Sequence, residues 1–172
     1  MLKQPRLLKA DEIEVRVKQV GETYAQLLLY KTARADMDIL DETYGAENWQ
    51  NDYKTVKDNM YCGVAVKNEN NEWVWKWDVG TESNTEKEKG EASDSFKRAC
   101  VRWGIGRELY TSPKIAALVD AMGGVKKDGS YWRLNNPYKR YSVKHITYND
   151  DRSINRLTII DDKGKIIWTN DR

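Results

Sequence analysis

The sequence of 172 residues predicts an α+β fold in which an antiparallel β-sheet packs on helices, with a β-rich C-terminal extension. Three observations predict this class. Strand-like runs are separated by turn residues, several segments carry apolar residues at helical spacing, and the last third alternates turns with short strand-like runs. A chain of this length forms one ordinary domain, so we expect a single domain over residues 1–172.

The first part of the chain predicts helices around a strand. Acidic residues followed by apolar residues at helical spacing favour a short helix over 11–20, and a compact apolar run favours a strand over 23–30. Thr32 is a suitable N-cap for a helix that runs to Thr43, and Gly45 is suited to end it.

The central part predicts three strands and then a loop. Strand-like runs cover 49–57, 60–67 and 73–79, and the turn residues at 68–71 favour an antiparallel hairpin between the last two runs. The polar stretch over 81–90 is expected to be a loop.

The segment that follows this loop is the most informative in the chain. Its apolar residues share one arc of a helix at i, i+3, i+4 and i+7 spacing: Ala92, Phe96, Ala99, Cys100 and Trp103. Arg98 and Arg102 project from the opposite side, with Lys97 on the flank, and two glycines end the helix at 104 and 106. A cationic face of this kind suits a phosphate backbone, and a merely solvated basic face is the alternative.

The last third predicts one more helix and several strands. The helix is expected over 113–122, and Asp128-Gly129 predicts a turn before a strand at 131–133. Further strands are expected at 142–148, 156–160 and 165–168, with a tight hairpin over 161–164. The β-rich extension covers 139–172.

Charge and aromatic content favour a polyanionic partner. From Pro113 onward 12 Lys and Arg face 7 Asp and Glu, a net charge of +5, whereas the first 112 residues carry 17 against 20, a net charge of −3. A chain with this asymmetry can bind a polyanion through one face. Seven Trp and ten Tyr against one Phe suit interfaces and base-stacking platforms, although core and sheet positions account for most of the rings.

Composition excludes several other classes. The two cysteines, Cys62 and Cys100, are too few for a disulfide framework and are interpreted as buried thiols. No run reaches the roughly 20 apolar residues of a membrane span, and the N-terminus has no signal-peptide core. We therefore expect a cytoplasmic protein without membrane contact.

Catalytic patterns are scarce. The only histidine is His145, there is no Cys/His metal spacing, and no Walker phosphate loop occurs. Asp161-Asp162-Lys163, with Asp150 or Asp151 upstream, loosely resembles the carboxylate–lysine set of metal-dependent nucleases. Its place at a hairpin tip favours a solvated turn, so we expect no catalytic residue, no metal and no cofactor.

Two blocks of residues point to a family. In the first, a helix ends at Tyr44-Gly45 and Trp49 follows four residues later; the second is the motif Asp94-x-x-Lys97-Arg98-Ala99-x-x-x-Trp103-Gly104. In this order, the blocks resemble the Rad52-type superfamily of single-strand annealing proteins, with the short phage members, often called Sak-type, as the nearest branch. The resemblance covers about residues 10–138.

The resemblance implies a β-β-β-α core that assembles into rings or open helical arrays. It also implies binding of single-stranded DNA in a basic groove and pairing of complementary strands without ATP, in DNA recombination and repair. The expected partners are single-stranded DNA, further copies of the chain, a single-strand binding protein and a 5'-3' exonuclease. A phage-encoded protein would act in the cytoplasm of its bacterial host.

The resemblance also implies site residues. A family lysine and arginine that contact the DNA backbone fall on Lys97 and Arg98, whereas Arg102 and Arg34 lie one residue from the positions of further family arginines. The expected DNA-binding residues are Lys97, Arg98, Arg102, Arg34, Lys31, Lys87, Lys89 and Arg107. Two alternatives remain open: a recombination mediator that binds DNA without annealing it, and a metal-dependent nuclease.

Overall fold

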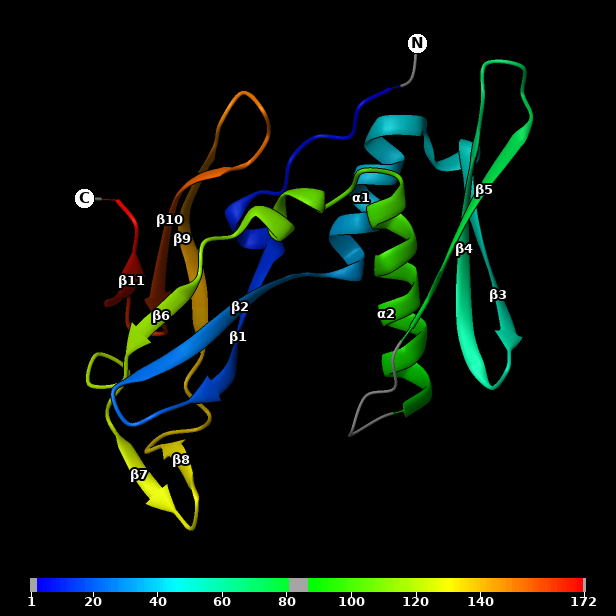
Figure 1. Cartoon of the computed structure of the whole chain (residues 1–172). Coiled ribbons are helices and arrows are strands. Elements are labelled where there is room, and N and C mark those ends of the chain that lie inside the picture. The colour runs from blue at the N-terminus through cyan, green and yellow to red at the C-terminus, as the bar shows by residue number, and fades with distance from the viewer. Residues whose placement is uncertain (1–2, 81–86, 172) are drawn as a thin grey trace. The chain divides into compact units, whose positions relative to one another are not determined.

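The computed structural model describes residues 3–80 and 87–171, with the backbone alone for 87–89. The fold is mixed α+β with mostly antiparallel strands, which confirms the predicted class (Figure 1). The chain forms two compact units. The first unit comprises Met1–Leu8 and Lys31–Arg107, and the second comprises Lys9–Tyr30 and Glu108–Arg172.

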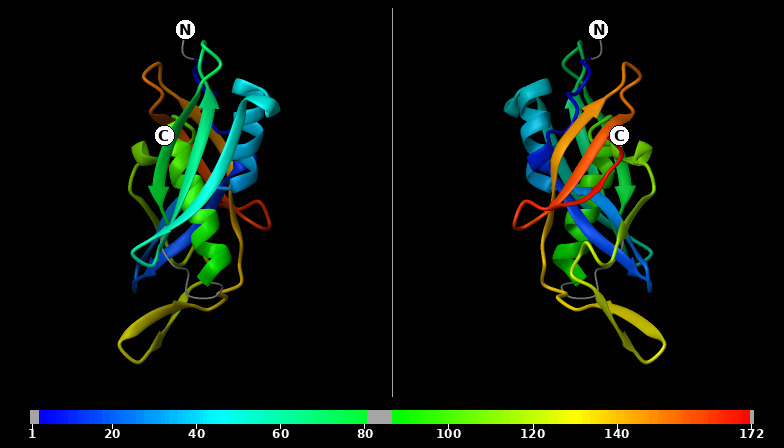
Figure 2. Two further views of the ribbon diagram at one scale, coloured as in Figure 1. Left: turned by 90° about the vertical axis from the view of Figure 1, so that its right-hand side faces the viewer. Right: turned by 90° about the vertical axis from the view of Figure 1, so that its left-hand side faces the viewer.

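The first unit combines two helices with a three-stranded sheet. Its elements are α1 (Ala33–Tyr44), the 3-10 helix η2 (Ala46–Asn48), β3 (Trp49–Val56), β4 (Asn59–Lys67), β5 (Trp73–Val79) and α2 (Lys87–Arg102). β4 is the central strand and is antiparallel to both neighbours. Figure 2 shows α2 along one face of this sheet, where it packs on β4 and β5. The predicted hairpin and the predicted basic helix are therefore confirmed.

Helix α1 has the predicted caps. The Thr32 hydroxyl accepts a hydrogen bond from the Ala35 backbone N–H at 3.1 Å. Gly45 ends the helix with φ +90°, a conformation that L side chains rarely adopt, and its N–H donates to the Asp41 carbonyl at 2.8 Å. Ile39 and Leu40 are fully buried, so one side of the helix joins the core of the first unit.

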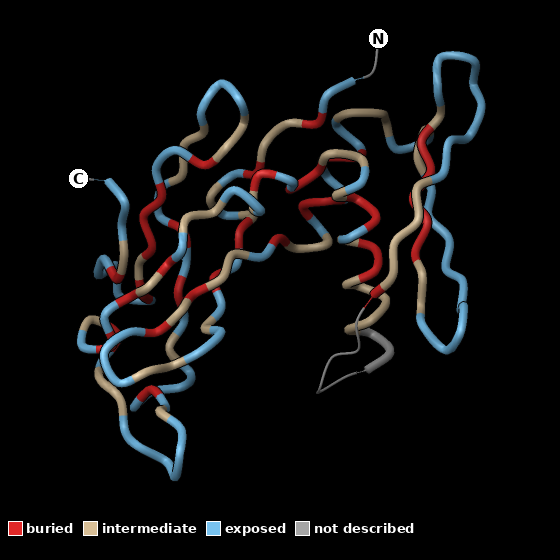
Figure 3. The backbone as a smooth tube through the Cα atoms, in the orientation of Figure 1, coloured by how far each residue is buried: buried red, intermediate tan, exposed pale blue. Residues whose placement is uncertain are grey.

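The core of the first unit lies between α2 and β4. The buried side chains are Phe96, Ala99 and Cys100 from the helix and Cys62, Val64 and Val66 from the strand. Figure 3 shows the buried stretches of both elements in red. This burial confirms the predicted apolar arc at Phe96, Ala99 and Cys100, whereas Ala92 is half-buried and Trp103, also half-buried, follows the last residue of the helix. Cys62 and Cys100 are the predicted buried free thiols.

The second unit is built on a six-stranded sheet. Apart from Lys31 and Arg107, which belong to the first unit, its elements are η1 (Ala10–Glu12), β1 (Ile13–Val20), β2 (Tyr24–Lys31), η3 (Arg107–Thr111), β6 (Ile115–Leu118), β7 (Val125–Asp128), β8 (Tyr131–Leu134), β9 (Tyr141–Tyr148), β10 (Ile154–Asp161) and β11 (Ile166–Thr169). The sheet order is β11-β10-β9-β1-β2-β6, and β7 and β8 form a separate hairpin. Its edge strands β6 and β11 lie next to each other, so the sheet nearly closes.

The predicted helix over 11–20 is wrong, because most of this segment is strand β1. Ile13 and Val15 are buried and alternate with exposed residues, which is the two-residue period of a strand. Apolar residues at 13, 17 and 20 also satisfy helical spacing, so the periodicity of this short segment was ambiguous. Strand β9 settles it by pairing with β1, with Glu14 opposite Ser142.

The predicted helix over 113–122 is wrong for the same reason. Ile115 and Ala117 are buried and alternate with Leu118, which is half exposed, so β6 follows a strand period. It pairs antiparallel with β2, and Leu27 lies opposite Ile115.

The expected loop over 81–90 is wrong in its last part, since α2 already begins at Lys87. Lys and Glu are good helix formers, which accounts for the extra turn. The part of this prediction that falls on 81–86 lies outside the described residues. The strands expected after residue 139 and the hairpin at 161–164 are confirmed as β9, β10 and β11.

Candidate nucleic-acid interface

Helix α2 carries the predicted cations on the part of its surface that is not packed on β4. Arg98 and Arg102 are 44% and 55% exposed, and Lys97 is half-buried. The two arginines are four residues apart, so they follow one another along one side of the helix. This placement agrees with the face expected from the sequence.

Both arginines have a carboxylate partner. Arg98 Nε lies 2.8 Å from Asp94 Oδ2 one turn earlier on α2, and Arg102 Nε lies 2.9 Å from Asp78 Oδ2 on β5. Exposed ion pairs of this kind contribute only about 0–1 kcal/mol, because water screens the attraction. A phosphate can therefore take the place of either carboxylate at small cost.

Two further cations hold the C-terminal end of α2. Arg107 Nη2 donates to the carbonyls of Val101 and Arg102 at 3.0 and 3.3 Å, and Lys76 Nζ donates to the Arg102 carbonyl at 3.0 Å. The carbonyls of a last helical turn lack partners in the helix and carry partial negative charge, so cations are favoured there. Lys76, Arg102 and Arg107 form what we call the C-terminal cation cluster.

Lys76 was missed by the sequence analysis. Burial, together with the charge of Arg107, lowers the pKa of Lys76, as expected for cations that lie close together. The alternation along β5 contained the necessary signal, because Val74, Lys76 and Asp78 share the sheet face that packs on α2.

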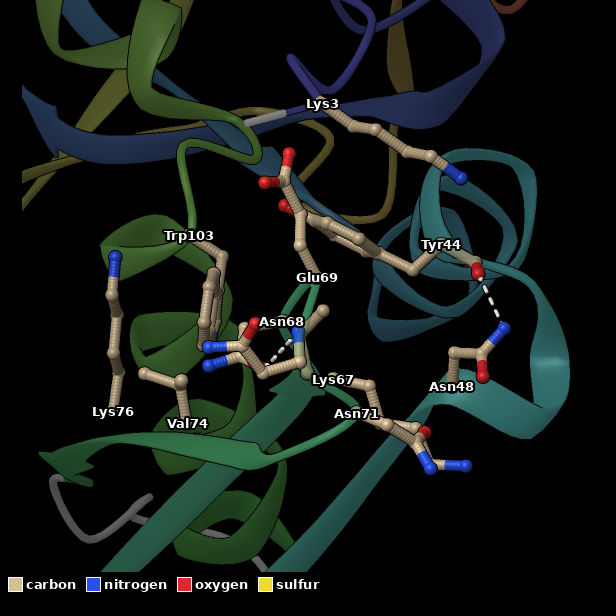
Figure 4. Close-up of a pocket in the computed structure, with 12 residues that line it drawn as sticks. Lys3, Tyr44, Asn48, Lys67, Asn68, Glu69, Asn71, Val74, Lys76 and Trp103 are labelled. Atoms are coloured by element: carbon tan, nitrogen blue, oxygen red, sulfur yellow. Dashed lines mark hydrogen bonds between the residues drawn. The ribbon is translucent and has the colours of Figure 1, made fainter. Parts of the chain in front are cut away.

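A pocket of about 740 Å³ lies beside this cluster in the first unit (Figure 4). Trp103 lines it: its indole N–H donates to the Val64 carbonyl at 2.9 Å, and Lys76 Nζ lies 4.2 Å from its ring centre. Tyr44 meets the same indole edge-on, with ring centres 6.1 Å apart, and Asn48 donates to the Tyr44 carbonyl at 2.9 Å. The pocket thus offers aromatic surface, amides and ammonium groups, which are the groups that contact nucleotides.

Lys31 is placed differently from the other expected cations. It is 6% exposed, it forms an ion pair with the fully buried Asp36, and its Nζ donates to the Lys97 carbonyl at 3.0 Å. A Cβ at Gly106 would lie 2.4 Å from Lys31 Cδ, so the glycine lets this side chain pass. Lys31 therefore joins the start of α1 to α2, and we leave it out of the proposed interface.

Comparison with known families adds a decisive observation. The domain described as Rad52/22 family double-strand break repair protein matches residues 3–123. The chain belongs to this family. Its members are non-catalytic DNA-binding proteins of recombination and repair, so the chain has a role in these processes. No curated protein and no solved structure gives a significant match.

The family match covers α1, α2 and the C-terminal cation cluster. Arg34 is exposed in the first turn of α1. The side chains of Lys87 and Lys89 lie outside the described residues. No helix in the described ranges is long and apolar enough to cross a membrane.

The aspartate of the nuclease alternative has a structural role. Asp161 is 3% exposed and accepts hydrogen bonds from the backbone N–H groups of Lys163 and Lys165 at 3.0 and 2.9 Å. The Lys139 ammonium, 2.8 Å away, lowers the pKa of Asp161 to about 2, so this carboxylate stays charged within the β10–β11 turn. Among the described residues no group of three His, Cys, Asp or Glu side chains could hold a metal ion.

Proposed function

We propose that this protein binds single-stranded DNA along α2 and anneals complementary strands without ATP, working as a homo-oligomer. The observation that supports this most directly is the series of exposed or partly exposed cations from Lys97 to Arg107 in a chain of the Rad52/22 family. The proposed contacts to phosphates come from Lys97, Arg98, Arg102, Arg107, Lys76 and Arg34. Lys87 and Lys89 remain predictions from the resemblance.

The proposed mechanism begins with an exchange of ion pairs. A phosphate replaces Asp94 beside Arg98 and Asp78 beside Arg102, and the strand releases condensed counterions to the solvent. Such contacts hold the backbone without reading its sequence, which leaves the base edges free to test a second strand. Base pairing supplies the driving force, so the reaction needs no ATP.

Oligomers contribute by extending one strand over several subunits. Repeated cations then offset the repulsion between two polyanions and suppress base pairing within one strand. We also propose that the protein resembles the short phage members of the family, and that it anneals strands as an oligomer as they do.

The first test measures annealing of two complementary fluorescent oligonucleotides without ATP or metal, with mass photometry of the same sample. We expect faster annealing by a large oligomer. Lys97→Ala combined with Arg98→Ala should strongly weaken binding to single strands while the oligomer persists. Over the low-salt range in which this variant still binds, loss of two phosphate contacts should make the negative slope of log affinity against log salt shallower by about 1.4. A double variant at the exposed Lys114 and Arg140, both changed to Ala, removes the same charge as a control.

The outcomes separate the alternatives. If the Lys97 and Arg98 variant binds as tightly as the parent at the same salt, α2 is not the interface. Binding by the parent without faster annealing would favour the mediator. Cleavage that depends on a divalent metal and disappears in Asp161→Ala would favour the nuclease.

A further inference from the structure

Strand β5 carries three tryptophans on the sheet face that points away from α2. Lys76 and Asp78 contact α2 residues from one face of this strand. Because successive side chains alternate between faces, Trp73, Trp75 and Trp77 share the other face. We call Trp73, Trp75 and Trp77, with the strand residues opposite them, the tryptophan face.

Small residues of β4 make room for these rings. Gly63 lies opposite Trp77, and a Cβ at this position would come within 2.5 Å of the Trp77 ring, so the indole lies directly on the glycine. Ala65 lies opposite Trp75 and is fully buried. The ring centres of Trp75 and Trp77 are 5.5 Å apart with their planes inclined by 21°, a stacked arrangement. The rings are therefore held in fixed positions across the sheet.

The tryptophan face is exposed and flanked by cations. Trp73 and Trp75 are each 37% exposed, although tryptophan is a side chain that folded proteins usually bury. Lys67 Nζ lies 5.1 Å from the centre of the Trp73 ring, and Lys54 Nζ lies 4.3 Å from the centre of the Trp77 ring. Each ammonium thus lies over the face of its ring at cation–π distance, and a base that stacks on that face of Trp73 or Trp77 takes the place of the ammonium.

We infer that the tryptophan face is a stacking surface for the bases of single-stranded DNA, an inference that rests on the proposed function. Every base has a flat aromatic face that can stack on an indole, and the flanking ammonium groups of Lys54 and Lys67 suit the phosphates between bases. Bases in a duplex are stacked on one another, so this surface suits a single strand. The β3–β5 residues of this face carry two ammonium groups, of Lys54 and Lys67, and one carboxylate, of Asp52 opposite Gly63, so the net positive charge favours a polyanion such as DNA as the occupant.

The tryptophan face is separate from the cations of α2, since the two lie on opposite faces of the same sheet. Stacking depends on bases, whereas the α2 contacts depend on phosphates. An oligothymidylate and an abasic oligonucleotide of equal length carry the same phosphates and differ only in their bases. The difference between the two affinities measures all contacts to bases, and the tryptophan variants then assign the share that belongs to the tryptophan face.

The experiment measures the affinity of both ligands by fluorescence anisotropy at one salt concentration. We expect the parent to bind oligothymidylate roughly tenfold or more tightly than the abasic strand, because stacking contributes about 1–3 kcal/mol per base. Trp73→Leu combined with Trp75→Leu should lose most of this difference, and Trp75→Phe, which keeps a ring, should retain most of it. Tyr131→Leu removes a 75% exposed ring of the second unit and should change nothing.

Three outcomes would overturn one proposal or the other. If the parent does not bind oligothymidylate, the proposed function itself fails. If the parent binds both ligands equally and the leucine variants match it, only the stacking inference fails. If the leucine variants lose self-association in sedimentation, the tryptophan face is a contact between copies. Circular dichroism checks that each variant folds, and Trp75→Phe preserves the test if the leucine variants do not.

Discussion

Carboxylate partners decide which cations of this protein are available to a phosphate. Lys31 is paired with a fully buried aspartate and donates to a helix carbonyl, so removing it from these partners would leave a buried charge alone. Arg98 and Arg102 are also paired, but these two arginines and their aspartate partners are partly exposed, so water competes with both ion pairs. Sequence position does not distinguish the two situations, whereas burial does.

A residue-level prediction concerns Asp78. Asp78→Asn removes the carboxylate that competes with phosphate for Arg102, and we expect single-stranded DNA to bind about two- to fivefold more tightly, as expected for loss of an exposed ion pair. The measurement is affinity by anisotropy at low and high salt, and the gain should shrink at high salt.

A matched control for this change is Asp58→Asn. Asp58 is exposed in the β3–β4 turn, and asparagine tolerates its φ of +61°. An equal gain in this variant would show that only net charge matters, which would contradict a specific role for the Asp78–Arg102 pair.

At the level of elements, the contact between α2 and β4 positions the interface. Cys62 on the strand and Cys100 on the helix are both fully buried in this contact. Burial raises the pKa of Cys62 to about 11 and raises that of Cys100 well above its ordinary value. The two thiols therefore report on whether helix and sheet stay together.

The corresponding prediction is slow thiol chemistry. At pH 8 only about one Cys62 thiol in a thousand is ionised in the folded protein, so we expect Ellman's reagent to react much more slowly with the native protein than with the protein in urea. Equal rates in both conditions would mean that α2 separates readily from β4.

The raised pKa also gives the sign of a pH dependence. The unfolded thiols ionise near pH 9 and the folded thiols ionise at higher pH, so their contribution to the free energy of unfolding is complete below about pH 9 and decreases as the pH rises toward 11. Cys62→Ala should reduce this loss in urea titrations at a series of pH values, and an unchanged loss would assign it to other groups.

At the level of the whole molecule, neither compact unit is one continuous stretch of chain. The second unit takes Lys9–Tyr30 from one part of the sequence and Glu108–Arg172 from another. Its sheet places β9 beside β1, so strands from both ends of the chain complete one hydrogen-bonded layer. Strands β7–β11 lie beyond the family match, which ends at residue 123.

A truncation tests this arrangement. A chain that ends at Tyr138 lacks β9, β10 and β11, so it leaves the hydrogen-bonding edge of β1 unpaired. We expect loss of β-sheet signal in circular dichroism and aggregation in size-exclusion chromatography. Removal of residues 171–172 alone should leave both measurements unchanged. A soluble, cooperatively melting chain of residues 1–138 would show that the last three strands are dispensable.

Local signals predicted the parts of the fold that local interactions determine. The caps of α1, the apolar arc of α2 and the β3–β5 strands each depend on residues a few positions apart, and all were read correctly. The segments of β1 and β6 were predicted as helices, because the apolar residues of short segments can satisfy helical and strand spacing alike. Pairing with β9 and with β2, which are distant in sequence, decided between the two periods.

For the candidate interface too, some features follow from local sequence and others depend on contacts between distant segments. The sequence by itself determined that α2 is amphipathic and cationic, because the helical period assigns its residues to faces. Only the tertiary structure decided that Lys31 is buried, that the face of β5 with Lys76 is the one that packs on α2, and that Trp73 and Trp75 on the other face are exposed. Burial and pairing depend on which elements meet in space, and a one-dimensional period does not contain that information.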